Sequence, residues 1–512
     1  MKFFDKSKFF IAGVVTTLLV TTTITAYTST LKKTITVDYN DIKINIDGKL
    51  IQPVDGYGKR VDPFIYEGTT YLPVRAVSQA LGKSVTWDGN TKTVKISSGQ
   101  IAKTNATLSM WIMPNSAYPE NDLMEIAKPY LGNNSNIELN VTLVDWGSAW
   151  TKITAAATSG DAPDITQLGN TWVGAISYMG ALADLTGKIN EDEFLPQTLK
   201  YSKMAGSSKV TSVPWFAETR ALFYRKDACQ KVGVDPKKDF ATWDSFKAAL
   251  KKLNNVEING KKLPALGMAG KNDWNVVHNF APWIFSAGGS FLNSNNTKGL
   301  LNSQEVFKGV KFYSELAYEG LIDWAALDTN TADIETAFAN GKYATSIIGP
   351  WNIQTLEDNK INNGNKLVDN VGVALFPAGP NGRKVFLGGS TLSVFESSKN
   401  KTEAIRLINF LTSKQAQIDY CKKTGNLPVV KEAYEDTWIT GNSMRKVFKD
   451  QMSYAVAYPT IPYWGPVEIY AQEGLSKVWD NVLGVNGKYD PNKTMNALKE
   501  ANERINVVLD SY

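Results

Sequence analysis

Three tryptophans each follow a predicted buried strand, and their chemistry suits a sugar or another amphipathic molecule. They are Trp111, Trp146 and Trp172, at the ends of the segments 108–110, 137–144 and 165–168. An indole offers a flat apolar face and a single N–H donor, which fits a sugar ring better than a phosphate or a metal ion. We therefore expect these side chains to form part of a ligand-binding surface.

The segments around these tryptophans predict the elements that position them. Helix-length stretches at 122–131 and 149–159 separate the three strands, which gives a β-α-β-α-β order. That order predicts a parallel sheet covered by helices. Ligands of open α/β sheets bind outside the carboxyl ends of the strands, which is where the tryptophans stand.

Bulk composition describes an ordinary globular protein of several domains. A chain of 512 residues is too long for one core, and we expect two or three domains. The hydrophobic content of 43% and charged content of 21% are typical of folded proteins. The net charge of +5, with no run of basic residues, argues against nucleic-acid binding.

The chain has one histidine, His278, and two cysteines, Cys229 and Cys421. A single histidine excludes histidine-rich zinc and copper sites and histidine-based catalytic triads, so we expect no metal and no cofactor. A bridge between the two cysteines is open, but two separate buried thiols are favoured.

Residues 1–33 predict a signal peptide or an uncleaved membrane anchor. Three lysines precede the uncharged stretch 9–31, whose 23 residues would span roughly 35 Å as a helix, enough to cross a bilayer. An anchor is favoured over a cleaved signal because Ile24 is a poor residue three positions before a cut after Ala26. No cysteine precedes Cys229, so a lipid anchor is not expected.

Residues 34–100 are expected to form a small α+β domain. Glu67-Gly68 predicts one hairpin turn and Asp88-Gly89-Asn90 another. Pro73 opens a helix that Gly82 ends.

This small domain resembles the copper amine oxidase amino-terminal-like domain of Gram-positive surface proteins. The resemblance is carried by Tyr66–Arg75 and Val85–Asp88. Copper amine oxidase chemistry needs several histidines and a tyrosine-derived quinone, and the segment has no histidine. The resemblance therefore implies a stalk or cell-envelope module and no oxidase activity.

Residues 105–512 are expected to form a larger domain. A strand after Val210 is predicted to cross out of the first part of this domain, and a helix should start near Lys226. Further helices are predicted at 243–253, 275–285, 303–318 and 331–340, followed by a strand at 343–348. Two more strands, at 371–377 and 388–394, are predicted to return to the first part of the domain. The chain from 401 onward is predicted to be mostly helical.

The large domain resembles family 1 extracellular solute-binding proteins, the sugar-capturing components of bacterial ABC importers. Four segments carry the resemblance in the family's order: Ala155–Ile165, Ala221–Asp227, Ala337–Ala344 and Thr402–Leu411. Arg225 stands where the family usually has asparagine. The resemblance implies a two-lobed, periplasmic-binding-protein-like α/β fold with hinge strands. Lobe 1 would hold about 106–215 and 385–428, and lobe 2 about 220–380 and 430–512.

The predicted ligand-binding residues combine aromatic faces with planar polar groups, as a sugar requires. They are Trp111, Asp145, Trp146, Asn170, Trp172, Trp215, Glu218, Arg220, Asn272, Asp273, Trp274, Trp351, Asn352, Tyr463 and Trp464. So many aromatic residues indicate an oligosaccharide more than a single ring.

Some of these residues have an equally good structural interpretation. Packing in the core explains Trp111, Trp215 and Trp464 as well as ligand binding does. Glu218 and Arg220 share a strand face and are able to pair with each other. Five tryptophans in helical patterns are predicted to be core residues: Trp150, Trp243, Trp283, Trp324 and Trp479.

The function expected from the resemblance is capture of an oligosaccharide and its delivery to an ABC permease. We expect a monomer on the surface of a Gram-positive bacterium, anchored through its amino-terminal segment. Two alternatives stay open. One is a surface sugar sensor or adhesin without a permease. The other, less favoured, is a glycoside-active enzyme, for which Asp145, Glu218 and Asp273 offer the carboxylates that must flank a glycosidic bond. The favoured expectation is that the protein is not an enzyme.

Overall fold

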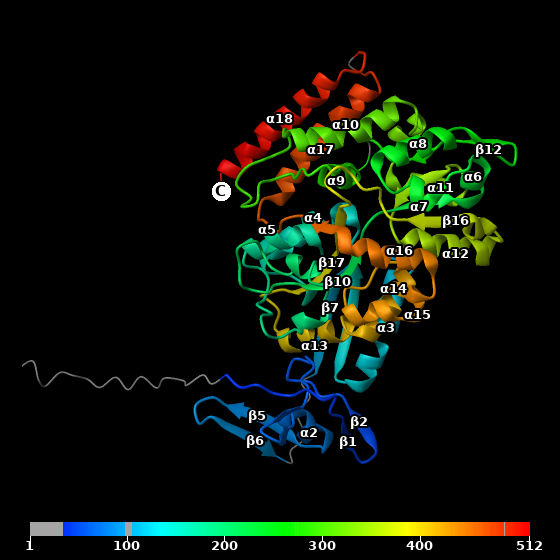
Figure 1. Cartoon of the computed structure of the whole chain (residues 1–512). Helices are drawn as coiled ribbons and strands as arrows, with labels where there is room; N and C mark the ends of the chain where they lie inside the picture. The colour runs from blue at the N-terminus through cyan, green and yellow to red at the C-terminus, as the bar shows by residue number, and fades with distance from the viewer. Residues whose placement is uncertain (1–33, 98–104, 272, 274, 486, 512) are drawn as a thin grey trace, which may run out of the picture.

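The structure, a computed structural model, describes residues 34–97, 105–271, 273, 275–485 and 487–511. The predicted signal or anchor at 1–33, and the predicted ligand residues Asn272 and Trp274, lie outside the described residues. Figure 1 shows a small amino-terminal domain below a larger two-lobed domain.

Three two-stranded hairpins and one short helix make up the small domain. The elements are β1 (Ile44–Ile46), β2 (Lys49–Ile51), β3 (Phe64–Tyr66), β4 (Thr69–Tyr71), α2 (Val74–Ala80), β5 (Ser84–Asp88) and β6 (Thr93–Ser97). Glu67 and Gly68 both take positive φ angles, 48° and 75°, in the β3–β4 turn. That is the turn conformation that tight hairpins favour. Both predicted hairpins and the helix after Pro73 are confirmed.

Lobe 1 is built on a six-stranded mixed sheet. Its strands are β7 (Ala106–Ile112), β8 (Ile137–Leu143), β9 (Ile165–Gly169), β10 (Val213–Glu218), β17 (Val385–Val394) and β18 (Ala455–Ala457). We expected all of 430–512 in lobe 2, but Val430 forms a bridge to Phe194 and β18 pairs with β17, so the chain from Val430 to β18 still contributes to lobe 1. β7 pairs in parallel with β8 and with β9, and helices α3 (Pro119–Asn133) and α4 (Trp146–Ser159) connect them. The predicted β-α-β-α-β unit is confirmed.

Lobe 2 has a four-stranded sheet in the order β14-β15-β11-β16. The strands are β14 (Leu266–Gly267), β15 (Thr345–Ile348), β11 (Ala221–Arg225) and β16 (Val371–Ala374). The strand pattern predicted that the segment near 371 returns to lobe 1, whereas the expected lobe bounds put it in lobe 2, and only the bounds are right. β16 pairs with β11, and Gly372 leaves room for the Tyr224 ring, which a Cβ at 372 would meet at 2.3 Å. β17 alone of the two predicted strands returns.

Helices cover both sheets, and those predicted at 243–253, 275–285, 303–318 and 331–340 are confirmed within one residue at each end. The remaining bounds are α5 (Val173–Tyr178), α6 (Lys226–Val232), α7 (Pro236–Asp239), α8 (Trp243–Leu253), α9 (Val276–Ser286), α10 (Gln304–Tyr318), α11 (Thr331–Ala339), α12 (Trp351–Asn363), α13 (Lys401–Leu411), α14 (Lys414–Thr424), α15 (Thr437–Thr440), α16 (Ser443–Gln451), α17 (Trp464–Val482) and α18 (Pro491–Asp510), with a hairpin of β12 (Val256–Ile258) and β13 (Lys261–Leu263).

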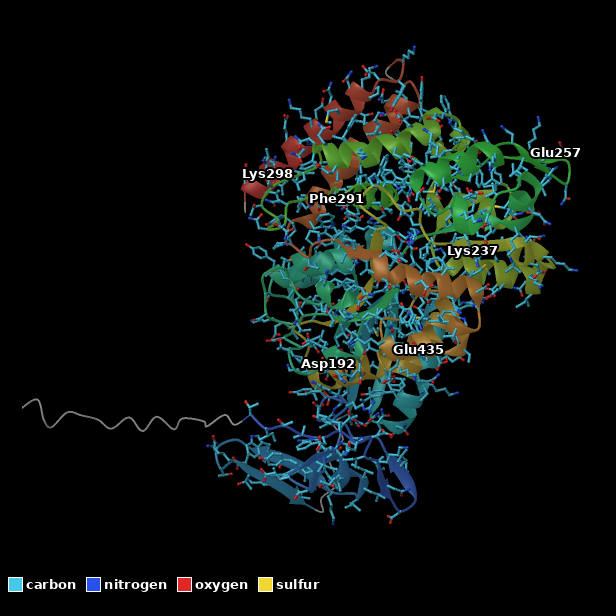
Figure 2. The ribbon with its side chains drawn as sticks, in the orientation of Figure 1. Asp192, Lys237, Glu257, Phe291, Lys298 and Glu435 are labelled. Atoms are coloured by element: carbon cyan, nitrogen blue, oxygen red, sulfur yellow. The ribbon has the colours of Figure 1, made fainter. Side chains whose placement is uncertain are left out.

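Buried side chains join the two lobes through the crossing strands. One apolar cluster runs from Leu108 in lobe 1 to Phe223 and Phe338 in lobe 2, and a second fills the rest of lobe 2. In Figure 2, Phe291 lies inside lobe 2, whereas Glu257 and Lys298 extend from its surface.

The two cysteines, Cys229 and Cys421, are free and buried, as the favoured prediction held. Burial raises the pKa of the Cys229 thiol to about 12. Within the described residues, no helix is both long enough and apolar enough to cross a membrane.

A candidate ligand site where the lobes meet

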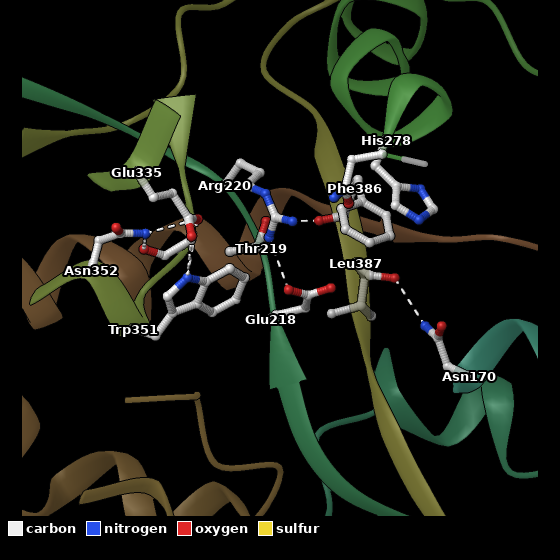
Figure 3. Close-up of polar contacts among 12 residues, drawn as sticks. Asn170, Glu218, Thr219, Arg220, His278, Glu335, Trp351, Asn352, Phe386 and Leu387 are labelled. Atoms are coloured by element: carbon white, nitrogen blue, oxygen red, sulfur yellow. Dashed lines mark hydrogen bonds and ion pairs between the residues drawn. The ribbon is translucent and has the colours of Figure 1, made fainter. Parts of the chain in front are cut away.

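The chain passes from the lobe 1 sheet to the lobe 2 sheet between β10 and β11, and Arg220 lies at this crossing. Its guanidinium is paired with Glu218 at 2.9 Å and only 3% of the residue is exposed. The guanidinium carbon is 4.9 Å from the Trp351 ring centre and 5.7 Å from that of Phe386 (Figure 3). Burial opposes its charge, but Glu218 and other carboxylates outweigh it and raise the Arg220 pKa.

Trp351 and Asn352 are held by one carboxylate, that of Glu335 on α11. The Trp351 Nε1–H is 3.0 Å from both Glu335 oxygens, and Asn352 Nδ2 donates to Oε1 at 2.9 Å (Figure 3). Burial raises the Glu335 pKa, although both donors and Arg220 work against that rise. We define the crossing-strand cluster as Glu218, Arg220, Glu335, Trp351 and Asn352.

Sequence reasoning missed Glu335. Its helical spacing resembles that of any surface glutamate, and its role depends on the packing of α11 against α12. The sequence did contain one signal of close packing near Trp351, namely Gly349. A Cβ at Gly349 would lie 2.3 Å from the Trp351 ring, so the chain needs glycine there for the indole to fold back.

A second group of aromatic residues lies in lobe 1 at the amino-terminal ends of helices. Trp146 is the first residue of α4, and Trp172 ends the short helix η1 (Asn170–Trp172). The rings of Trp146 and Trp150 each lie 5.8 Å from the ring of Trp172. We call Trp146, Trp150 and Trp172 the tryptophan cluster.

The tryptophan cluster is accessible. Trp146 is 38% exposed and Trp150 is 37% exposed. The prediction that Trp150 is a core residue was wrong: it lies one turn after Trp146 on α4, and its indole extends over Trp172 instead of into the sheet. Trp324, another predicted core residue, is 47% exposed. The other three, Trp243, Trp283 and Trp479, are buried as predicted.

The remaining lobe 1 candidates lie around this cluster. Trp111 is inside β7 and not after it, and it packs half-buried against the same small core as Trp172. Asp145 caps α4 by accepting from the Gly147 N–H at 2.8 Å. Asn170 is buried and donates to the Leu387 carbonyl at 3.1 Å, which ties η1 to β17 (Figure 3).

Two predicted ligand residues are packed in the cores. Trp215 has no exposed surface and stacks on Tyr420, with ring centres 4.4 Å apart. Trp464 is 1% exposed, stacks on Tyr458 and donates to Glu468 at 3.1 Å. In this conformation neither offers a face to a ligand.

Of the other lobe 2 candidates, Asp273 is buried and Tyr463 is partly exposed. The Asp273 carboxylate accepts from the Asn275 backbone at 3.1 Å and from the Thr331 hydroxyl. It therefore fastens the loop before α9 to the start of α11. Tyr463 is the residue before α17.

A polar network at the end of β7 is a further feature that sequence reasoning missed. Asn115 Nδ2 donates to Gln167 at 2.9 Å and to the Tyr420 hydroxyl at 3.0 Å. Gln167 Nε2 in turn donates to Ser390 at 2.8 Å. The partly exposed Asn115 is thereby held rigid, and its place soon after a strand end was the signal that could have found it.

His278, expected to have no special role, lies beside the crossing. Its ring stacks on Phe386 at 4.4 Å, and Nδ1 is 3.0 Å from the Tyr458 hydroxyl. Burial lowers the His278 pKa to about 3 and raises that of the neighbouring Glu468 to about 7. Both groups are therefore mostly uncharged between about pH 3 and pH 7.

A cavity of about 730 Å³ also opens between the lobes. Its walls include Met204 on the lobe 1 side and Phe291 and Asn293 on the lobe 2 side. Trp464 is the predicted ligand residue in its wall, and the tryptophan cluster does not line it. Among the described residues no group of histidines, cysteines and carboxylates is arranged to hold a metal.

Comparison with known proteins identifies two regions. The family of bacterial extracellular solute-binding proteins matches residues 125–446, and the copper amine oxidase N-terminal domain matches 20–96 and 54–144. The diacetylchitobiose-binding protein of Streptomyces coelicolor is 26% identical over 71% of this chain and 82% of its own length. The maltooligosaccharide ABC transporter solute-binding lipoprotein of Streptococcus pneumoniae is 26% identical over 60% of this chain and 69% of its own.

Solved structures share the fold. The sugar-binding protein MalE of Xanthomonas citri superposes with a TM-score of 0.68 at 22% identity, covering 79% of this chain and 98% of its own. The family consists of binding proteins, and the amino-terminal match is to a non-catalytic domain, so the chain is not an enzyme. Because the family match covers well over half of the sequence, this chain belongs to the bacterial extracellular solute-binding proteins.

Proposed function

We propose that the protein captures an oligosaccharide between its lobes and delivers it to the membrane subunits of an ABC importer. The observation that carries the proposal is the accessible tryptophan cluster in lobe 1, since exposed indole faces are surfaces for sugar rings. The names of the relatives, which bind diacetylchitobiose and maltooligosaccharide, support the ligand class.

Lobe 2 supplies the opposite wall in this proposal. Trp351, held by Glu335 and stacked on Arg220, offers a ring in a fixed orientation. Aromatic contacts contribute roughly 0.5–1.5 kcal/mol each beyond area burial, so several of them with polar contacts account for the roughly 8 kcal/mol of a micromolar complex. Ligand contact with both lobes would close the hinge at β10–β11 and β17.

The proposal also covers the cellular location of the protein. The protein acts as a monomer at the surface of a Gram-positive bacterium, with residues 1–33 as its membrane anchor. The uncharged stretch 9–31 between lysines supports the anchor. Membrane fractionation with amino-terminal sequencing tests it: a mature chain that starts at Tyr27 in the soluble fraction would replace the anchor with a cleaved signal.

Isothermal titration calorimetry against malto-, chito-, galacto-, cello- and xylo-oligosaccharides tests the ligand class. We expect one sugar series to bind at one site per chain, with no change in the sugar after incubation. Failure of every series to bind would contradict the proposal, and so would hydrolysis of the bound sugar.

A filling variant separates the proposed cleft from the 730 Å³ cavity. Met204→Trp places an indole in the cavity wall without changing either cluster. Unchanged affinity is expected if the sugar lies on the tryptophan cluster. A large loss of affinity in a folded variant would place the sugar in the cavity instead.

A further inference from the structure

A loop of the small domain, residues 53–61, reaches up to lobe 1. We propose that this loop, the docking hairpin, clamps the small domain onto lobe 1 so that the two move as one rigid body. The resemblance of this domain implied a stalk, and the docking hairpin would make that stalk a fixed support. Figure 1 shows the small domain next to α13, at the end of lobe 1 that faces away from lobe 2.

The docking hairpin is rigid by its own hydrogen bonds. Asp55 Oδ1 accepts from the backbone of Tyr57 at 2.8 Å and of Lys59 at 3.1 Å, and the Asp55 N–H donates to the Lys59 carbonyl at 2.8 Å. Gly58 has a φ of +83°, which side chains rarely adopt. A loop that is ordered before it docks loses little conformational entropy on docking.

Two side chains of α13 donate hydrogen bonds to backbone carbonyls of this loop. Arg406 Nε donates to the Gly56 carbonyl at 2.8 Å, and Asn409 Nδ2 donates to the Tyr57 carbonyl at 2.7 Å. The same Asn409 amide also donates to the Lys188 carbonyl at 3.0 Å. One amide therefore joins the small domain, α13 and the loop before η2 (Glu191–Glu193).

Packing and charge reinforce these bonds. Tyr57 packs against the lobe 1 core, and Lys188 Nζ lies 5.6 Å from the centre of its ring. Arg60 pairs with Asp62 at 2.7 Å and also faces the carboxylates of Glu193 and Glu432, all of which raise its pKa. Arg60 is thus attracted to two carboxylates of lobe 1.

Among the described residues, both side chains of α13 that bond to the small domain do so through the hairpin. Beside it a cavity of about 930 Å³ separates Gln52 and Gln79 of the small domain from Tyr130 and Asn136 of lobe 1. Loss of the hairpin contacts should therefore release the domain. The lobe partners named above all belong to lobe 1, so the clamp would leave lobe 2 free to close; this last consequence rests on the proposed function.

Distance measurement by pulsed electron spin resonance on the full chain tests the clamp. Nitroxide labels go on Thr70→Cys in the small domain and Lys128→Cys in α3, both exposed positions. The natural cysteines are buried and stay unlabelled. We expect one narrow distance distribution. A broad distribution in the otherwise unaltered chain would overturn the proposal.

Variants then locate the clamp. Arg406→Ala with Asn409→Ala removes the donors while leaving every residue of the small domain unchanged, and Tyr57→Ala removes the packed ring. Each change is expected to broaden the distribution at least twofold. The matched control is Tyr39→Ala, which removes a 65% exposed ring of the same domain and should keep the distribution narrow. A distribution that stays narrow in both docking variants, with lobe 1 still folded by circular dichroism, would overturn the proposal.

Discussion

The two aromatic clusters at the junction use the same side chain in opposite ways. In lobe 1, Trp146 and Trp150 keep 38% and 37% of their surface exposed and touch each other through Trp172. In the crossing-strand cluster, Trp351 is bonded to Glu335 and stacked on Arg220, of which 3% is exposed. The tryptophan cluster exposes ring faces to solvent, whereas the side chains of the crossing-strand cluster are held in a fixed geometry by their partners.

The difference follows from what each cluster must bury. Apolar indole faces gain by leaving water for any partner, so an exposed group of them stores binding energy. A buried guanidinium must be paired and stacked, because an unpaired buried charge is costly. We therefore expect loss of the buried ion pair of Arg220 to act on folding, and loss of a ring face, in the tryptophan cluster or at Trp351, to act on binding.

The largest effect is expected from Arg220→Ala. The change leaves Glu218 and Glu335 near each other without their cation, and breaking a buried pair costs about 3–5 kcal/mol. Urea unfolding should show this loss. The matched control is Arg504→Ala, whose pair with Glu473 is about half exposed and should contribute little to stability. Equal losses in the two variants would remove the distinction between the clusters.

Trp146→Ala is expected to act on affinity and not on stability. Loss of an exposed ring face should weaken sugar binding at least tenfold, about 1.4 kcal/mol, with an unchanged urea midpoint. Trp324→Ala serves as the control, because Trp324 is 47% exposed but lies elsewhere on lobe 2. Calorimetry that finds the same affinity for both variants would argue against the tryptophan cluster.

Stability should depend on pH through Glu468. Its pKa is raised from 4.5 to about 7 by burial, so the folded state holds a proton that the unfolded state releases. Its contribution is present below about pH 4.5 and is lost as pH rises to about 7. His278, with its pKa lowered to about 3, acts oppositely and destabilises the fold as pH falls below about 6.5.

The variant Glu468→Gln separates these two groups. It should remove the loss of stability that Glu468 causes as pH rises from about 4.5 to about 7, and keep the loss that His278 causes as pH falls below about 6.5. Urea midpoints of both proteins at pH 5, 6, 7 and 8 measure the difference. A constant difference across this range would mean that Glu468 does not titrate there.

The smallest effect is expected from Trp150→Ala. Its ring supports Trp172 from the side, and an aromatic pair contributes about 0.5–1.5 kcal/mol. Because Trp150 acts through Trp172, we expect the lower part of that range, a rise in Kd of about two- to fivefold, which calorimetry resolves. An effect larger than that of Trp146→Ala would make Trp150 the main contact of lobe 1.

The sequence predicted most of the elements because their signals are local. Helices α8, α9, α10 and α11 follow the apolar spacing that predicted them, and the small-domain hairpins follow their turn residues. Partner choice between strands is not local. The strand pattern at Val371 therefore pointed to the wrong lobe, since it does not show the pairing with β11.

The site was predicted less well than the fold for the same reason. Strand-end position brought Trp146, Trp172 and Trp351 to notice, and all three stand at or beside helix starts near the junction. Spacing could not show that Trp215 packs on Tyr420 or that Trp150 is accessible, because both depend on neighbours distant in sequence. That Glu335 binds Trp351 and Asn352 is seen only in the folded structure, because Glu335 lies on α11 whereas the other two residues lie on α12.

The central claim is that one sugar molecule contacts both lobes, and calorimetric titration of Trp172→Ala and Trp351→Ala tests it most directly. With the sugar that binds the unaltered protein best, we predict one site per chain and at least a tenfold rise in Kd, about 1.4 kcal/mol, for each variant. Circular dichroism should confirm that both variants are folded. Unchanged affinity in both variants would contradict the account.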